Sequence, residues 1–324
     1  MRRANGSPAP LAPTLAPVYS SLTGTRGTAM DIKAILMGTA FALMWSSAFT
    51  SARMIVADAP PVTALALRFL ISGGIGVAIA ALMGQSARLT RPQWRATIIF
   101  GLCQNALYLG LYFVAMQRIP ASLASILAST MPLIVAVAGW AFYGDRLRPL
   151  GIAGLATGFA GVVVIMSHRP GGGVDLPGLI LCLMGVTALA FATLTVRGAA
   201  GGGGNLLMVV GLQMLVGCAA LTVVAAVWEW PDGIAVHWTP RLIAAFVYTT
   251  LVPGLLATWV WFRLVGRIGA VRAATFHFLN PFFGVAIAAL LLGEALTRWD
   301  VRGVAIIAAG ILAVQISRAG PQSG

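Results

Sequence analysis

The chain has 324 residues, of which 59% are hydrophobic and 9% are charged, and its mean hydropathy is +0.91. A soluble domain carries roughly 25% charged residues, so this composition excludes an ordinary soluble fold and indicates a membrane protein. The net charge of +13 could suggest nucleic acid, but the Arg and Lys residues gather in loops and form no basic stripe with exposed aromatic residues. We therefore expect no nucleic-acid partner. Three cysteines without metal-ligand spacing fit neither a disulfide framework nor a zinc site, and we expect no metal and no cofactor.

Residues 1–30 form a first segment that we expect to be a disordered tail. It carries four prolines among Ala, Ser, Thr and Gly, and it holds no apolar run long enough for a signal peptide. Met30 directly precedes the first apolar run, so a translation start there is an alternative. N-terminal sequencing of the native protein distinguishes the two.

Ten apolar runs follow, and each is long enough to cross a bilayer, which takes about 20 residues as a helix. The first five lie at about 32–55, 61–83, 96–117, 121–143 and 149–167, and the second five at about 177–197, 205–228, 242–265, 270–293 and 300–317. The sequence therefore predicts an all-α integral membrane protein with ten transmembrane helices. We expect a first five-helix repeat at 31–168, a Gly-rich linker at 169–176 and a second repeat at 177–318.

The two sets of runs are copies of one design. Residues of the fourth and fifth runs recur in the ninth and tenth at a constant spacing of 149 residues (281 − 132): Pro132 as Pro281, Gly144 as Gly293, Asp145 as Glu294, Gly154 as Gly303 and Gly161 as Gly310. A constant spacing without gaps indicates a duplication. Because each copy holds an odd number of crossing helices, the second copy enters the membrane upside down. Inverted repeats are typical of secondary transporters, which bind substrate near the midplane between the copies.

The charges of the loops predict the orientation. With the N-terminus inside the cell, 14 Arg and Lys residues lie on the inner side of the membrane and 6 on the outer side. Cytoplasmic loops collect positive charge, so we expect both termini in the cytoplasm.

The pattern Pro…Gly-Asp/Glu…Gly, present in both copies, resembles the paired EamA units of the drug/metabolite transporter superfamily. The resemblance covers about residues 32–318. Arg68-Phe69 is similar to the Arg-Phe pair of the second helix in this family, and Trp45-Ser46-Ser47 resembles its Trp-Gly-Ser pattern, with Ser46 in place of Gly. Among ten-helix members, the chain most resembles the YddG-type amino acid exporters. The resemblance implies a transporter of the bacterial inner membrane that exports amino acids or other small metabolites, and we expect a monomer.

Eight polar and aromatic residues within the runs are candidates for substrate binding. They are Trp45, Asn105, Tyr108, Tyr112, Phe191, Trp261, His277 and Asn280. A cavity for a small amphipathic solute needs apolar walls with a few polar groups, and the helical spacing of Asn105, Tyr108 and Tyr112 places them on one stripe. The equivalent stripe of the second copy is Gly254, Ala257 and Trp261. The alternatives are aromatic packing for Trp45 and Phe191, membrane-interface anchoring for Tyr112 and Trp261, and a hydroxyl partner in the bundle for His277.

Arg68, Pro132 and Pro281 are candidates for a hinge or a gate. A proline within a helix removes one backbone hydrogen bond, and irregular backbone at membrane depth is tolerated where it is buried or lines a cavity. The alternative is a packing kink. Arg68 lies well inside an apolar run and needs a partner, for which Asp58 and Glu294 are the candidates. A structural anchor is the alternative role for Arg68.

Small residues at helical spacing predict close helix contacts rather than ligand sites. They are Ser122, Ser125 and Ser129 on the fourth run, Gly154 and Gly158 on the fifth, and Gly303 and Gly310 on the tenth. The glycine run 201–204 is expected to be a flexible connector.

No Asp or Glu lies in the middle third of any run, which disfavours a cationic drug as the substrate. No nucleophile and base lie within reach of one another, so we do not expect an enzyme. Besides the amino acid exporter, the sequence leaves open an exporter of another neutral or drug-like metabolite, a lipid flippase and an intramembrane enzyme.

Overall fold

The structure is a computed structural model that describes residues 32–144, 148–168, 175–195, 205–268, 273 and 276–319. Within this part of the chain, nine helices are long and apolar enough to cross a membrane, and a further apolar helix, Phe276–Leu292, is shorter. The same part contains no strand, which confirms the predicted all-α membrane fold. The predicted tail, most of the linker, Asp145 and the connector at 201–204 lie outside the described residues.

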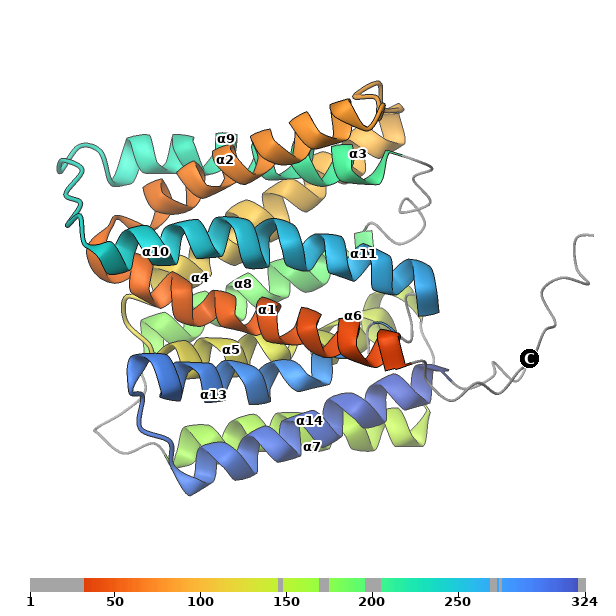
Figure 1. Cartoon of the computed structure of the whole chain (residues 1–324). Coiled ribbons are helices and arrows are strands. Elements are labelled where there is room, and N and C mark those ends of the chain that lie inside the picture. Colours follow the sequence, from red (N-terminus) through yellow and green to blue (C-terminus); the bar gives the residue numbers. More distant parts are fainter. Residues whose placement is uncertain are drawn as a thin grey trace, which may run out of the picture.

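The helices run side by side, roughly from left to right in Figure 1. The first copy comprises α1 (Ile32–Asp58), α2 (Pro61–Leu82), α3 (Arg91–Phe100), the π-helix η1 (Gly101–Tyr108), α4 (Leu109–Ala115), α5 (Ala121–Ser129), α6 (Met131–Tyr143) and α7 (Pro149–Ser167). The second comprises α8 (Leu176–Thr195), α9 (Leu206–Trp228), α10 (Pro240–Thr249), the π-helix η2 (Thr250–Leu256), α11 (Ala257–Ile268), the 3₁₀-helix η3 (Phe276–Leu279), α13 (Asn280–Leu292) and α14 (Arg298–Ala319). We name the two ends of the bundle the Ile32 end and the Asp58 end, after the ends of α1.

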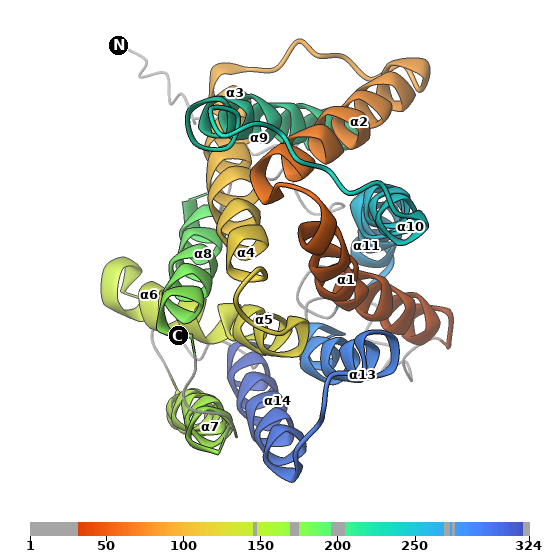
Figure 2. The ribbon, with the colours of Figure 1, turned by 90° about the vertical axis from the view of Figure 1, so that its left-hand side faces the viewer.

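Two pairs of equivalent helices hold the copies together, α2 with α9 and α7 with α14. Figure 2, which looks onto the Asp58 end, shows these pairs at opposite edges of the molecule. A Cβ added to Gly154 would lie 2.8 Å from the Gly310 carbonyl oxygen, and one added to Gly161 would lie 2.9 Å from the Gly303 carbonyl oxygen. Each glycine thus contacts the repeat mate of the other, the reciprocal contact that a two-fold axis produces. The copies are inverted, and the predicted glycine packing faces are confirmed.

The fourth helix of each copy is broken at the same place. In the first copy the break at Thr130 separates α5 from α6, and in the second the break at Leu279 separates η3 from α13. Pro132 and Pro281 each follow two residues later, at the second position of the new helix, where a missing N–H costs no helical hydrogen bond. Beyond the break, α6 packs against α8, whereas α5 packs against α13.

Candidate functional site

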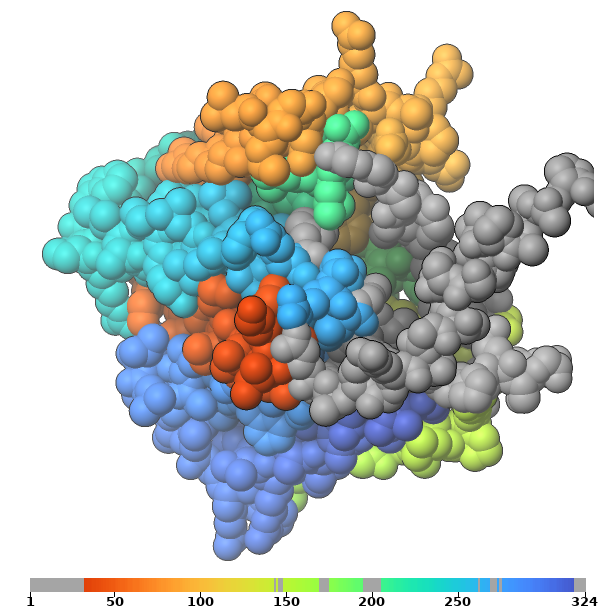
Figure 3. Space-filling model, turned by 45° about the vertical axis from the view of Figure 1, so that its right-hand side comes forward, coloured from red at the N-terminus to blue at the C-terminus, as the bar shows by residue number. Residues whose placement is uncertain are grey.

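One face of α1 faces the inside of the bundle. Helix α1 packs against α10, α11, α13 and α5, and Figure 3 shows its first residues, in red, between α11 in light blue and the C-terminal helices in blue. Because a helix repeats every 3.6 residues, side chains at intervals of three to four share this face. They are Phe41, Trp45, Phe49, Ala52 and Val56.

An internal cavity of about 40 Å³ lies beside the middle of this face. Its walls include Trp45 and Phe49 from α1, Arg68 from α2, Tyr108 and Tyr112 from η1 and α4, and Pro253 from η2 of the second copy. A volume of this size holds no more than a few water molecules, since each needs about 10–15 Å³ on this measure. Ligand pockets usually have some 300–1,000 Å³, so the cavity in this structure is too small to hold a metabolite.

The aromatic wall of the cavity comes mainly from the first copy. The ring centroids of Tyr108 and Tyr112 are 4.6 Å apart, and those of Phe49 and Tyr112 are 6.0 Å apart. Both tyrosines are buried. The π-helix η1 carries Tyr108, and short π segments within helices frequently occur at functional sites. The predicted stripe therefore contributes Tyr108 and Tyr112 to the cavity.

The remaining member of that stripe, Asn105, lies elsewhere. Its side-chain nitrogen donates to the Gln213 carbonyl oxygen of α9 at 2.9 Å, and its Cβ packs against Gly217 of the same helix. The wider turn of the π-helix separates residues that a regular helix would align. Asn105 thus joins η1 to α9 and does not line the cavity.

A second aromatic cluster lies next to the cavity on the side of the Ile32 end. The Phe41 ring centroid is 5.7 Å from that of Trp45, 4.8 Å from Trp261 and 5.3 Å from His277. The Trp261 and His277 rings meet edge to face at 5.0 Å. Trp45 belongs to both groups, so the structure connects Trp261 and His277 to the cavity through α1.

Asn280 takes part in a polar contact between three helices. Its carbonyl oxygen accepts from Ser46 Oγ of α1 at 3.2 Å and from Ser125 Oγ of α5 at 3.5 Å. Gly284 of α13 gives Ser125 the space to approach. Ser46, where the sequence departs from the Trp-Gly-Ser pattern, therefore bonds the second copy, a role that the sequence did not reveal.

Phe191 lies apart from the other candidate residues. Its side chain is 56% exposed and shares the outward face of α8 with Ile180 and Met184. The opposite face, with Cys182 and Gly185, packs against η1 and α4. The structure thus does not bring Phe191 to the cavity.

The predicted ion-pair partners of Arg68 are wrong. The Glu294 carboxylate accepts from the backbone N–H groups of Ala121 and Ser122 at 2.7 and 3.0 Å, and the Asp58 carboxylate accepts from Thr239 Oγ1 at 3.0 Å. Helix N-termini have unpaired N–H groups and a positive dipole end, which bind a carboxylate. Glu294 therefore stabilises the start of α5, and neither carboxylate forms an ion pair with Arg68.

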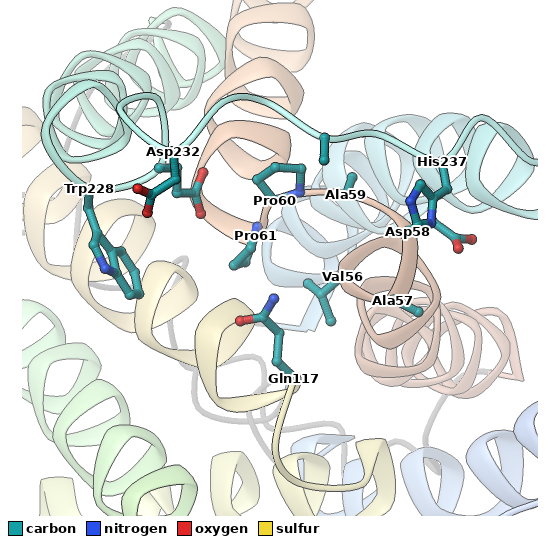
Figure 4. A pocket seen from close by; sticks show the side chains of 12 residues that line it. Val56, Ala57, Asp58, Ala59, Pro60, Pro61, Gln117, Trp228, Asp232 and His237 are labelled. Carbon is teal, nitrogen blue, oxygen red and sulfur yellow. The ribbon is translucent and has the colours of Figure 1, made fainter.

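A larger pocket of about 410 Å³ opens at the Asp58 end. Figure 4 shows it between the α1–α2 turn at Pro60, the side chain of Gln117 at the end of α4, and Trp228 and Asp232 of the second copy. Its lining comes from turns far apart in the sequence, so no sequence pattern predicted it.

The two cavities follow one another along α1 and α4. Ala52 and Met116 line the inner cavity, whereas Val56 and Gln117, one turn or one residue further on, line the outer pocket. Val56 and Met116 are buried, and the Arg53 guanidinium donates to the Met116 carbonyl oxygen. These side chains close the inner cavity towards the Asp58 end.

Two inverted sets of membrane helices around a central cavity define a membrane transporter. The chain belongs to the EamA-like transporter family, whose model matches it twice, over residues 32–167 and 176–316. The uncharacterized transporter YvbV of Bacillus subtilis is 26% identical over 84% of this chain and 88% of its own length. A probable amino-acid metabolite efflux pump of Salmonella typhimurium is 25% identical over 83% of this chain and 90% of its own length.

A further relative is similar over one half of the chain. The aromatic amino acid exporter YddG of Ancylobacter novellus is 31% identical over 43% of this chain and 48% of its own length. A crystal structure that is 23% identical superposes with a TM-score of 0.64, covering 89% of this chain and 98% of the other, which supports the fold.

Proposed function

We propose that this transporter exports amino acids or related small metabolites across the bacterial inner membrane. The observation that carries the proposal is the aromatic cavity beside the middle of α1, which is lined by the first copy and by Pro253 of the second. An apolar cavity with a few polar groups suits a solute with a polar head and an apolar body. The names of two relatives, an aromatic amino acid exporter and a probable amino-acid metabolite efflux pump, support this substrate class.

The proposed mechanism is alternating access. The inner cavity of about 40 Å³ is too small for an amino acid, so transport requires the copies to move apart on one side at a time. The breaks at Thr130 and Leu279, next to Pro132 and Pro281, are the proposed hinges, because they lie at equivalent positions beside the cavity helices. Separation of Val56 from Met116 would join the inner cavity to the outer pocket.

The proposed orientation places both termini in the cytoplasm and the Asp58 end outside, in accordance with the distribution of Arg and Lys. The pocket of about 410 Å³ is then the exit. Reporter fusions at either end of the chain test this proposal, and active periplasmic reporters at the C-terminus would contradict it. We propose a monomer, because one chain contains both copies and supplies every described residue that lines the cavity, and a dimeric mass in detergent would argue against it.

The experiment that tests the function is counterflow. Purified full-length protein in liposomes is preloaded with one amino acid at a time, and uptake of the labelled compound is measured at two pH values. We expect uptake above protein-free liposomes for amino acids with apolar side chains. The absence of uptake for all twenty amino acids would overturn the proposed function.

A further inference from the structure

Arg68 is a buried cation that forms no ion pair with an acidic side chain of the described residues. Its side chain is 6% exposed, and its Nε atom has no hydrogen-bond acceptor among the described residues. In that part of the chain the one ion pair is Arg118 with Asp175, at 3.2 Å. The carboxylates of Asp58, Glu229, Glu294 and Asp300 accept hydrogen bonds from backbone or hydroxyl donors at the ends of helices.

Arg68 is one of the residues that line the inner cavity. Its Cζ is 5.2 Å from the centre of the Phe69 ring. A Cβ added to Gly254 in η2 would lie 3.6 Å from its Nη2, so the missing side chain of Gly254 leaves room beside the charge. The Trp45, Tyr108 and Tyr112 side chains form the other walls of the same cavity.

A charge in this position needs an anionic partner. Arginine stays protonated in proteins, and burying an unpaired ion costs several kcal/mol. A carboxylate can accept two parallel hydrogen bonds from a guanidinium, which makes the pair both strong and specific. None of the described residues that line the inner cavity is acidic, so an ammonium group finds no matching charge among them.

We propose that Arg68 is the specificity-determining residue of the passage and binds a carboxylate of the transported molecule, while the aromatic walls hold its apolar body. This inference rests on the proposed function and narrows it. The substrate class is carboxylates with an apolar side chain, with or without an amino group. Amines that lack the carboxylate are excluded.

Three compounds that share an indole ring test the inference: L-tryptophan, indole-3-propionate and tryptamine. Each competes against labelled L-tryptophan in counterflow with the full-length protein. We expect L-tryptophan and indole-3-propionate to compete, and tryptamine to bind about 100-fold more weakly, because a site that loses its charge partner is left with an unpaired ion. Competition by tryptamine within about threefold of L-tryptophan would overturn the inference and leave the proposed function intact.

The variants Arg68→Lys and Arg68→Gln separate recognition from packing. We expect Arg68→Lys to keep the preference for carboxylates with weaker binding, and Arg68→Gln to lose it. A preference that persists in Arg68→Gln would contradict the inference. A merely structural role would weaken competition by all three compounds by the same factor.

A binding measurement keeps this test independent of transport. The unfolding temperature of the purified protein is measured with indole-3-propionate and with tryptamine. We expect only the carboxylate to raise it, and only when Arg68 is present. If no amino acid is transported, the proposed function fails, but this measurement still decides on Arg68, and equal shifts with both compounds would overturn the inference.

A second pair of variants applies if Arg68→Gln does not fold. Gly254→Asp places a fixed carboxylate beside Arg68, and Gly254→Asn places a neutral group of the same shape there. We expect Gly254→Asp to weaken the binding of indole-3-propionate, measured through the unfolding temperature, about tenfold more than Gly254→Asn, since the added carboxylate pairs with the guanidinium. Equal effects of the two variants would overturn the inference.

Discussion

The third helices of the two copies have the same backbone conformation, with a π-helix at equivalent positions, but they differ in their side chains. The π-helices η1 and η2 begin at Gly101 and Thr250, which are repeat mates. In the first copy this region carries Tyr108 and Tyr112, which fill the cavity wall. In the second copy the mates are Ala257 and Trp261, and Gly254 takes the place of Asn105. The small residues leave the space that the Arg68 guanidinium adjoins. The duplication thus accounts for the shared helix positions, and the differences in side chains account for the aromatic cavity wall in the first copy.

The largest expected effect comes from adding a side chain to the second copy at Gly254, beside Arg68. Gly254→Leu adds a branched side chain whose Cβ would already lie 3.6 Å from Arg68 Nη2. We expect transport in counterflow to fall by about 100-fold or more, because the cavity has no spare volume. Gly266→Leu on the same long helix is the control, since no atom lies within 4 Å of an added Cβ there. Equal activity of both variants would contradict the assignment of the cavity.

Equivalent glycines in the contact between α7 and α14 should contribute equally to stability in both copies. A Cβ added to Gly310 would lie 2.5 Å from the Gly158 nitrogen, and one added to its mate Gly161 would lie 2.9 Å from the Gly303 carbonyl oxygen. We expect Gly161→Ala and Gly310→Ala each to lower the free energy of unfolding by about 1–3 kcal/mol. Thermal unfolding in detergent measures this, and Gly74→Ala, where nothing lies within 4 Å, is the control. A large effect in only one copy would argue against the two-fold contact.

A third prediction concerns the removal of an aromatic side chain from the first copy. Tyr108→Ala gives the first copy the residue that the second copy has at position 257. We expect affinity for L-tryptophan to fall about tenfold, since one aromatic contact and its buried area are lost. Counterflow at several concentrations measures the affinity, and size-exclusion chromatography checks the fold. An unchanged affinity would remove Tyr108 from the proposed site.

The smallest expected effect concerns His277, whose repeat mate is Ala128. His277→Ala removes a ring that contacts Phe41 and Trp261 at 5.3 and 5.0 Å. Because His277 reaches the cavity only through neighbouring rings, we expect transport to fall about threefold, as for the loss of one aromatic pair. A loss as large as that of Gly254→Leu would show that His277 contacts the substrate directly.

The sequence predicts the membrane helices and their duplication well, since the repeat and its prolines can be recognised in one sequence without an alignment. The break beside Pro132 and Pro281 and the glycine contact of α7 and α14 follow from that pattern. It does not predict which face of an apolar helix points inward, because lipid and core are equally apolar and select similar side chains. Phe191 is the result of this ambiguity, whereas Asn105 leaves the predicted stripe because η1 is a π-helix. The partners of Arg68 depend on tertiary distances, which no local pattern encodes.

The equivalence of the two helix breaks bears on the transport cycle. Thr130 has φ −76° and ψ −8°, and Leu279 has φ −78° and ψ −18°. When two upside-down copies exchange conformations, an inward-facing shape becomes an outward-facing one. At the two proposed hinges the dihedral angles already agree, so exchanging the conformations of the copies would leave these residues almost unchanged, as expected for an occluded intermediate between two open forms. An occluded intermediate of this kind lets a substrate change sides without a continuous pore ever forming across the bilayer.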